Sequence, residues 1–150
     1  MSIRKSATLL LLLTAALLPP ALLADGPAAA ITPDLLIERQ LVQGPDLVVL
    51  DVRSAAEFAA GHVPGAVNVP HDQIEARLDE LAGLRDKDVV VYCHTGRRAA
   101  LAVETLTRHG FTRLEHLAGD MQSWTADHRP VEQSPAAEAP APPAMPPHPP

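Results

Sequence analysis

The stretch Val89-Val90-Val91-Tyr92-Cys93-His94-Thr95-Gly96-Arg97-Arg98-Ala99-Ala100 decides the fold expected of this 150-residue chain. Four β-prone residues lead into the chain's one cysteine, a short loop follows, and a helical pattern begins at Arg98. In open α/β sheets, ligands bind where the strands end, and the first turn of a helix offers free N–H groups to anions. The stretch therefore predicts a strand, an anion-binding loop and a helix, with a thiol at the edge of the sheet.

The thiol of Cys93 has two interpretations. The helix N-terminus and the two arginines favour the thiolate, which is the nucleophilic form of cysteine. A lone cysteine is also often a buried structural residue, but a Gly-Arg-Arg run is not typical of a buried apolar site. We therefore favour a reactive thiol. With one cysteine the chain can form no internal disulfide, so the thiol is free, modified or paired with another molecule.

The beginning of the chain reads as a secretory signal peptide. A basic start is followed by a 12-residue apolar run, Ala7–Leu18, and by the small residue Ala24 at a cleavage position. The run is shorter than the roughly 20 residues that span a membrane, so an uncleaved anchor is the weaker alternative, and Ala28–Ala30 offers a second cleavage site. We expect a signal peptide over 1–24, a linker over 25–30 and a periplasmic protein, secreted if the cell has no outer membrane.

The C-terminal segment differs in composition from the rest of the chain, because nine of the 21 residues from Pro130 to Pro150 are proline. This composition predicts a disordered Pro/Ala-rich tail over 130–150, with a docking motif as the alternative, and leaves 31–129 as the folded domain. The chain carries a net charge of −6, and removal of Arg4 and Lys5 with the signal leaves 10 basic against 18 acidic residues. Such an acidic chain is expected to bind neither nucleic acid nor, after signal cleavage, a membrane.

Strand and helix patterns alternate along the middle of the chain, which predicts an α/β fold with a mostly parallel sheet. The predicted helices are one opened by Thr32-Pro33-Asp34, a short one opened by the capping box Ser54–Glu57, and those over 72–82, 98–109 and 119–127. The predicted strands, besides the one before Cys93, are an edge strand at Ile31, Leu47–Val52, Ala66–Val69 and Phe111–Leu117. Trp124, in the last helix, is expected to pack in the core.

Three blocks of this sequence resemble the single-domain rhodaneses, which are thiosulfate sulfurtransferases. The blocks are Asp51-Val52-Arg53 with Glu57-Phe58, Gly61-His62-Val63-Pro64-Gly65-Ala66-Val67-Asn68-Val69-Pro70, and Cys93-His94-Thr95-Gly96-Arg97-Arg98. The resemblance covers Ile31 to Trp124 and implies a rhodanese-like α/β fold, with a five-stranded, mostly parallel sheet flanked by helices on both faces. One departure is Asp120 after Gly119, where the family often has a second glycine. We expect it to alter the local turn but to lie away from the nucleophile.

The resemblance implies that Cys93 takes the outer sulfur of thiosulfate or a related donor, releases sulfite and holds the sulfur as a persulfide. A thiol, cyanide or a protein sulfur acceptor then removes it, in two-step covalent catalysis. The active-site loop that would cradle the persulfide consists of His94, Thr95, Gly96, Arg97 and Arg98. Arg98 would fix the loop or bind an anion, and Arg97 would attract the anionic donor. No general base and no cofactor are required, and we expect a monomer.

Structural roles are expected for four further residues. Asp51, Arg53 and Glu57 are expected to hold the loops through ion pairs, and His62 to cap the Gly61–Ala66 turn. The seven histidines show no metal-ligand spacing with Cys93, so no metal site is predicted.

Two other functions compete with sulfur transfer. Phosphatases and arsenate reductases of related fold use a Cys-x5-Arg loop, large enough for a tetrahedral oxyanion, whereas here the spacing from Cys93 to Arg98 is Cys-x4-Arg and the sixth position holds Ala99. A non-turnover sulfur carrier or protein-binding module would use the same persulfide, and the sequence leaves that alternative open.

Overall fold

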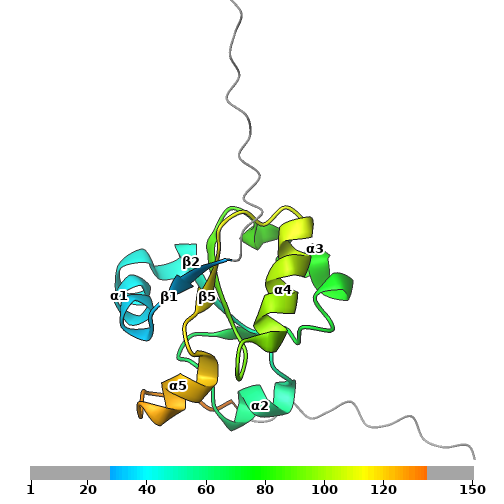
Figure 1. The fold of residues 1–150 in the computed structure, drawn as a ribbon. Helices are drawn as coiled ribbons and strands as arrows, with labels where there is room; N and C mark the ends of the chain where they lie inside the picture. Colours follow the sequence, from blue (N-terminus) through cyan, green and yellow to red (C-terminus); the bar gives the residue numbers. More distant parts are fainter. Residues whose placement is uncertain (1–27, 135–150) are drawn as a thin grey trace, which may run out of the picture.

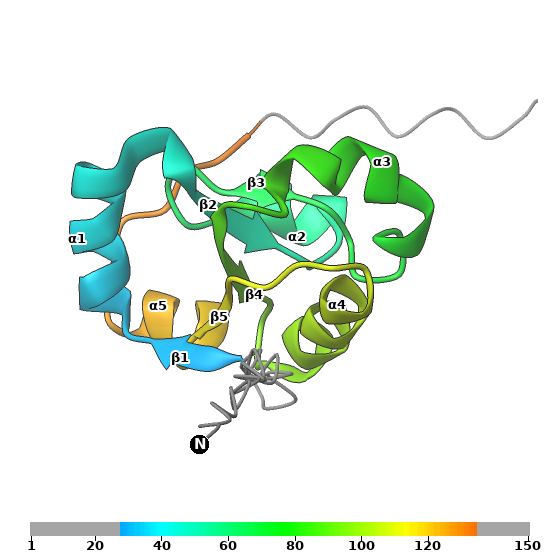
Figure 2. The ribbon, with the colours of Figure 1, turned by 90° about the horizontal axis from the view of Figure 1, so that it is seen from above.

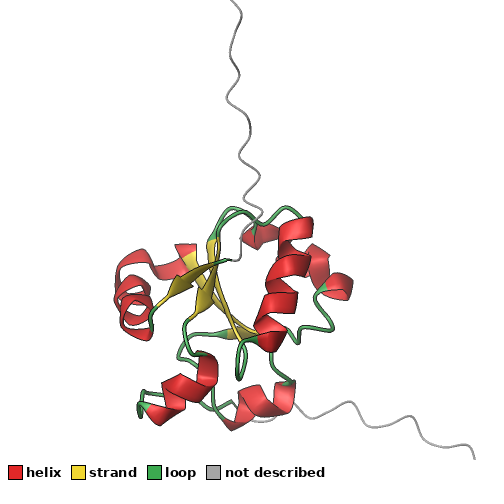
Figure 3. Ribbon diagram, in the orientation of Figure 1, coloured by secondary structure: helices red, strands yellow, loops and turns green. Residues whose placement is uncertain are grey.

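Five parallel strands run through the middle of the molecule, and helices cover both of their faces (Figures 1 and 3). The computed structural model describes residues 28–134; the predicted signal peptide and residues 135–150 of the predicted tail lie outside this range. The strands are β1 (Ala29–Ile31), β2 (Leu47–Asp51), β3 (Val67–Asn68), β4 (Asp88–Tyr92) and β5 (Leu114–Leu117). The α-helices are α1 (Pro33–Gln43), α2 (Ala55–Ala60), α3 (Leu78–Leu81), α4 (Arg97–Arg108) and α5 (Asp120–Ala126).

The strand order is β1-β5-β4-β2-β3, and every neighbouring pair is parallel. The predicted α/β fold is therefore confirmed, and Ile31 lies in an edge strand as expected. β4 lies at the centre, where Val48 pairs with Val89 and Leu50 pairs with Val91. Because all strands point the same way, the segments that follow β2, β4 and β5 meet at one end of the sheet.

Each central strand buries both of its faces, because alternate side chains point to opposite sides of the sheet. On β4, Val89 and Val91 pack against α3 and α4, whereas Val90 and Tyr92 pack on the opposite side. That second side is covered by α1 and α5, and Figure 2 shows the helices on either side of the sheet. Trp124 of α5 is 1% exposed, which confirms its predicted place in the core.

The two predicted helix starts are confirmed by their capping contacts. The Thr32 hydroxyl accepts a hydrogen bond from the Leu35 N–H, and Pro33 occupies the first helical turn of α1. Ser54 and Glu57 form a complete capping box at the start of α2, in which each side chain accepts a hydrogen bond from the other's backbone N–H.

The prediction of one continuous α-helix over 72–82 is wrong. The segment contains the 3₁₀ turn Glu75–Arg77, the four-residue α3 and a second 3₁₀ turn, Ala82–Leu84. Ile74 and Leu81 are both buried, as the apolar spacing required. A spacing of three or four residues suits 3₁₀ and α turns alike, so the pattern could not distinguish them.

Three strands are shorter than predicted, and β2 loses a single residue, because it ends at Asp51 rather than Val52. β5 begins at Leu114 rather than Phe111, because Val89 of β4 is the first residue that pairs with it. Phe111 instead fills the core below α4. β3 comprises Val67–Asn68 alone, although the N–H groups of Val69 and His71 still donate to the carbonyls of Asp51 and Val52, both at 3.1 Å.

The folded part extends beyond both predicted boundaries. β1 begins at Ala29, inside the predicted linker. At the other end, residues 130–134 were predicted as the beginning of the tail, but the backbones of His62 and Glu132 exchange two hydrogen bonds of 2.9 Å in an antiparallel bridge. The Trp124 indole N–H also donates to the Pro130 carbonyl at 2.7 Å. Contacts with distant residues therefore order a Pro-containing segment that has no internal period of its own.

Candidate active site

Cys93 immediately follows β4, at the end of the sheet where α2 and α5 also lie (Figure 1). The chain turns at Gly96, whose φ of +92° is a left-handed conformation that favours glycine, and α4 begins at Arg97. The Gly96 N–H donates to the Cys93 sulfur over 3.1 Å. The strand, loop and helix expected around the thiol are therefore present, and a backbone donor points at the sulfur from the start of a helix.

The burial of Cys93 differs from the expectation for a residue beside a Gly-Arg-Arg run. The residue is 1% exposed and packs in an apolar cluster with Leu50, Val52 and Val91. The arginines do not alter this environment, because they lie beyond the turn, where Arg97 is exposed and Arg98 is half-buried. The sulfur thus has an apolar side toward the sheet and a polar side toward the loop.

Arg98 forms a two-pronged ion pair with Glu57 of α2, with N···O distances of 2.7 and 2.8 Å. The hydrogen bond from Arg98 lowers the pKa of Glu57 to about 2, and the same contact raises the pKa of Arg98. The Cys93 sulfur contributes to the raised pKa of Arg98 as well, after Glu57. Arg98 therefore ties α4 to α2 across the front of the thiol, and its charge is already neutralised by a carboxylate.

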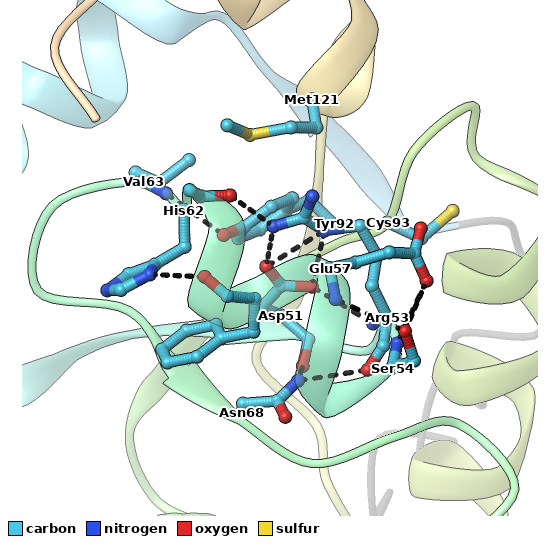
Figure 4. Close-up of polar contacts among 12 residues, drawn as sticks. Asp51, Arg53, Ser54, Glu57, His62, Val63, Asn68, Tyr92, Cys93 and Met121 are labelled. Carbon is cyan, nitrogen blue, oxygen red and sulfur yellow. Dashed lines mark hydrogen bonds and ion pairs between the residues drawn. The ribbon is translucent and has the colours of Figure 1, made fainter. Parts of the chain in front are cut away.

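Asp51 and Arg53 form a second, fully buried ion pair after β2 (Figure 4). The Arg53 guanidinium contacts the Asp51 carboxylate at 2.5 Å and donates to the Gly61 carbonyl at 2.8 Å. Burial by itself would lower the pKa of Arg53, but the hydrogen bond with Asp51 and the charge of that carboxylate together raise it. Asn68 donates to the Asp51 and Arg53 carbonyls. These contacts connect the segment after β2 to the end of α2 and to β3.

His62 does not cap the turn that follows it. Its Nδ1 lies 2.8 Å from the Phe58 carbonyl at the end of α2, and its ring stacks on the Phe58 ring with centroids 3.6 Å apart. Because a carbonyl can only accept, Nδ1 carries a proton. The turn itself is closed by the backbone, where the Ala66 N–H donates to the Val63 carbonyl.

Asp120 does not lie away from the nucleophile, contrary to the expectation from the sequence. Its carboxylate accepts a hydrogen bond of 2.8 Å from the Cys93 N–H, and its second oxygen lies 3.0 Å from Nε2 of His116. Asp120 is 3% exposed and has a φ of +52°, which non-glycine residues seldom adopt. One signal was visible in the sequence, a carboxylate where the resembling family often has glycine, but α5 had to be placed against the loop before its meaning was clear.

A pocket of about 370 Å³ opens beside the Cys93 loop. Its lining residues come from three distant parts of the chain, 53–61, 94 and 121–131: Arg53, Glu57, Ala60, Gly61, His94, Met121, Thr125 and Val131. His94 is exposed and adjoins the thiol in the chain, and Val131 belongs to the segment that had been expected to be tail. Thr95, on the same loop, and Arg97, the first residue of α4, are also exposed.

The described residues hold neither a candidate metal centre nor a candidate membrane span. Within residues 28–134, no three His, Cys, Asp or Glu side chains gather as metal ligands would. In the same part of the chain, no helix is both long and apolar enough to cross a bilayer.

Comparison with known proteins gives one consistent family. The rhodanese-like domain matches residues 33–127. A sulfurtransferase of Allochromatium vinosum is 32% identical over 95 residues, which are 63% of this chain and 87% of that protein. The putative sulfur carrier protein YrkF of Bacillus subtilis is 32% identical over 100 residues, which are 65% of this chain but 53% of that protein. This chain therefore corresponds to about half of YrkF.

A solved structure agrees with these sequences. The rhodanese-related protein of Thermoplasma volcanium superposes with a TM-score of 0.61 and 30% identity, and the match covers 71% of this chain and 99% of that one. The fold thus agrees with the sequence match. This chain belongs to the rhodanese-like domain family, whose members that it resembles include sulfurtransferases and sulfur carriers.

Proposed function

We propose that this protein transfers the sulfane sulfur of thiosulfate, or of a related donor, to a thiol or cyanide acceptor through a persulfide on Cys93. The observation that carries the proposal is the sulfur at the end of β4, which accepts the Gly96 N–H at 3.1 Å beside the first turn of α4. Backbone donors and a helix N-terminus stabilise a thiolate or persulfide anion there. Arg98 and Glu57 fasten the start of α4 to α2, and so hold this loop in place.

The chemistry balances in two displacement steps. The Cys93 thiolate attacks the outer sulfur of thiosulfate, the S–S bond breaks, and sulfite leaves with the bonding electron pair. The acceptor thiolate or cyanide then attacks the outer sulfur of the persulfide, and Cys93 leaves as a thiolate. Neither step needs a general base, because nucleophile and leaving group are both anions.

The loop is a poor match for phosphoryl or arsenate chemistry. Gly96 turns the chain three residues after Cys93, and Arg98 is already committed to Glu57 through two hydrogen bonds. The position that a Cys-x5-Arg loop requires holds Ala99, which is fully buried. A loop of this size suits one added sulfur atom better than a tetrahedral oxyanion.

A sulfur-carrier role is the second candidate, and one relative, YrkF, bears that description. Carrier and enzyme share the persulfide and differ in how the sulfur leaves it. An enzyme releases sulfite and thiocyanate repeatedly when thiosulfate and cyanide are both present, whereas a carrier loads once and waits for a specific protein acceptor.

Intact mass spectrometry tests the proposal. We expect thiosulfate to add one sulfur atom to the protein and cyanide to remove it as thiocyanate, with no gain in Cys93→Ser. Thr107→Ser, at an exposed position of α4 outside the loop, is the control and should still load, because it leaves the thiol and its loop unchanged. If the wild-type protein gains no sulfur from thiosulfate or from a low-molecular-weight persulfide donor, sulfur transfer by Cys93 is ruled out.

We further propose that the protein is exported, with cleavage after Ala24 and a periplasmic or secreted mature form. The support is the basic start and the apolar run of residues 7–18, which lie outside the described residues. The same mass spectrum, taken on protein from a secreting host, should show a chain that begins at Asp25. A chain that keeps its first 24 residues would contradict export by cleavage.

A further inference from the structure

An ion pair between the half-buried His116 and the buried Asp120 lies directly behind the loop that carries the thiol. Asp120 accepts the Cys93 N–H through one carboxylate oxygen and contacts His116 Nε2 through the other, at 2.8 and 3.0 Å. A methyl group placed on Gly96 would lie 3.1 Å from the same Asp120 oxygen and 3.3 Å from the His116 ring. The pair thus leaves little room for a side chain on the turn that presents the Gly96 N–H to the sulfur.

His116 is the cationic partner of this carboxylate. Among the described residues, it is the one basic side chain within ion-pair distance of Asp120. The charged or titratable groups on the neighbouring elements are Cys93 and His94 on the loop and Arg97 and Arg98 at the start of α4. Arg98 is held by Glu57, so it does not replace His116 beside Asp120.

We propose that Asp120 and His116 are a positioning pair, and that the net charge of this pair controls how readily the Cys93 thiolate forms. With His116 protonated the pair is neutral, and the Cys93 thiolate forms beside it without repulsion. When His116 loses its proton, the Asp120 carboxylate stays behind as an uncompensated negative charge. That charge disfavours the thiolate and, if the proposed function holds, also an anionic donor such as thiosulfate.

The direction of the effect with pH follows from the same contact. The hydrogen bond to Asp120 raises the pKa of His116 above its ordinary value of 6.5. The pair is therefore neutral at acidic pH and becomes negative as the pH rises through this raised pKa. Below the pKa of His116 the pair therefore favours the Cys93 thiolate, and above that pKa it opposes the thiolate.

The ultraviolet absorbance of the thiolate tests this without any reagent having to reach the buried sulfur. The chain has one cysteine, so the difference from Cys93→Ser isolates its titration. The one tyrosine, Tyr92, does not interfere, because burial raises its pKa far above the working range. We expect His116→Gln to move the thiolate midpoint upward by about one pH unit, as a nearby like charge does.

Two rescue variants distinguish charge from structure. His116→Lys keeps a cation beside Asp120, and the double variant His116→Gln with Asp120→Asn removes both charges. Both should return the midpoint close to that of the wild type. His109→Gln is the matched control, because His109 forms the same kind of contact with Glu75, at 3.1 Å, on the exposed side of the molecule. It should leave the midpoint unchanged.

The outcomes separate this inference from the proposed function, on which its donor-binding part rests. An unshifted midpoint in His116→Gln, an equal shift in His109→Gln, or no return in His116→Lys would overturn the inference, whatever the protein does with thiosulfate. A shift with the expected rescues, but without sulfur transfer, would support the inference and reject thiosulfate as the donor. If the midpoint shift and sulfur transfer are both observed, kcat/KM for thiosulfate should fall about tenfold in His116→Gln at the pH where the wild-type pair is neutral.

Discussion

Glu57 has two structural contacts at once, since it completes the capping box of α2 and clamps Arg98 of α4. Replacement by Gln keeps an oxygen for the Ser54 N–H and removes the charge, so it isolates the ion pair. We expect Glu57→Gln to lower the free energy of unfolding at neutral pH by about 1 kcal/mol, a value discounted because the Glu57 side chain is 37% exposed. Urea denaturation measures it.

The pH dependence of this loss has a definite sign. The pKa of Glu57 falls from 4.5 to about 2 on folding, so its stabilising effect is present above pH 4.5 and disappears as the pH falls toward 2. Wild type and Glu57→Gln should therefore converge in acid. Glu80→Gln, which breaks the exposed pair with Arg77, is the control and should cost less at neutral pH. An equal cost, or a gap that persists in acid, would show that the charge of Glu57 does not act as described.

At the scale of elements, the junction between β5 and α5 is the most constrained turn near the thiol. Gly119 has a φ of +76°, and a Cβ added there would lie 2.2 Å from the Ser123 hydroxyl oxygen, inside α5 itself. Gly110, at the end of α4, has a φ of +85° but nothing within 4 Å of such a Cβ. The two glycines therefore share the backbone requirement and differ in the steric one.

We expect Gly119→Ala to destabilise the protein by about 3 kcal/mol, because it adds a clash to the backbone strain. Gly110→Ala should cost about 1 kcal/mol, the strain alone. Urea denaturation of both variants gives the difference. Equal losses would mean that Ser123 moves aside freely and that α5 is not held rigidly at its first turn.

At the scale of the whole molecule, residues 130–134 close the fold over α2 and α5. A chain ending at Arg129 loses the backbone bridge to His62 and the carbonyl of Pro130 that binds the Trp124 indole. Compared with a chain ending at Ser134, its free energy of unfolding should be lower by about 3 kcal/mol, at roughly 1 kcal/mol for each of these three hydrogen bonds, without counting the exposed ones that Glu132 and Gln133 also form.

The fluorescence of Trp124, the one tryptophan of the chain, reports the same truncation. Its emission should shift to longer wavelength in the chain that ends at Arg129, because the indole N–H loses its buried partner. Both chains lack residues 135–150, so the comparison concerns residues 130–134 alone. Identical stability and emission would show that this segment rests on the surface without supporting it.

The sequence by itself determined the order of strands and helices along the chain and the position of the thiol directly after a strand. Apolar runs such as Leu47–Val52 have the length and the double-sided burial of parallel strands, and local signals such as the Ser54–Glu57 capping box act within a few residues. Such features depend on neighbouring residues in the chain, so they can be predicted from it. The Cys93 loop belongs to this class, because strand, thiol, glycine turn and helix follow one another directly.

Only the tertiary structure decided what surrounds the thiol. The partnership of Arg98 with Glu57, 41 residues apart, and that of Asp120 with Cys93, 27 residues apart, exist because separate elements meet at one end of the sheet. The burial of Cys93 and the ordering of residues 130–134 have the same origin. No local pattern encodes them, because their energy comes from contacts that form when the sheet brings distant segments together.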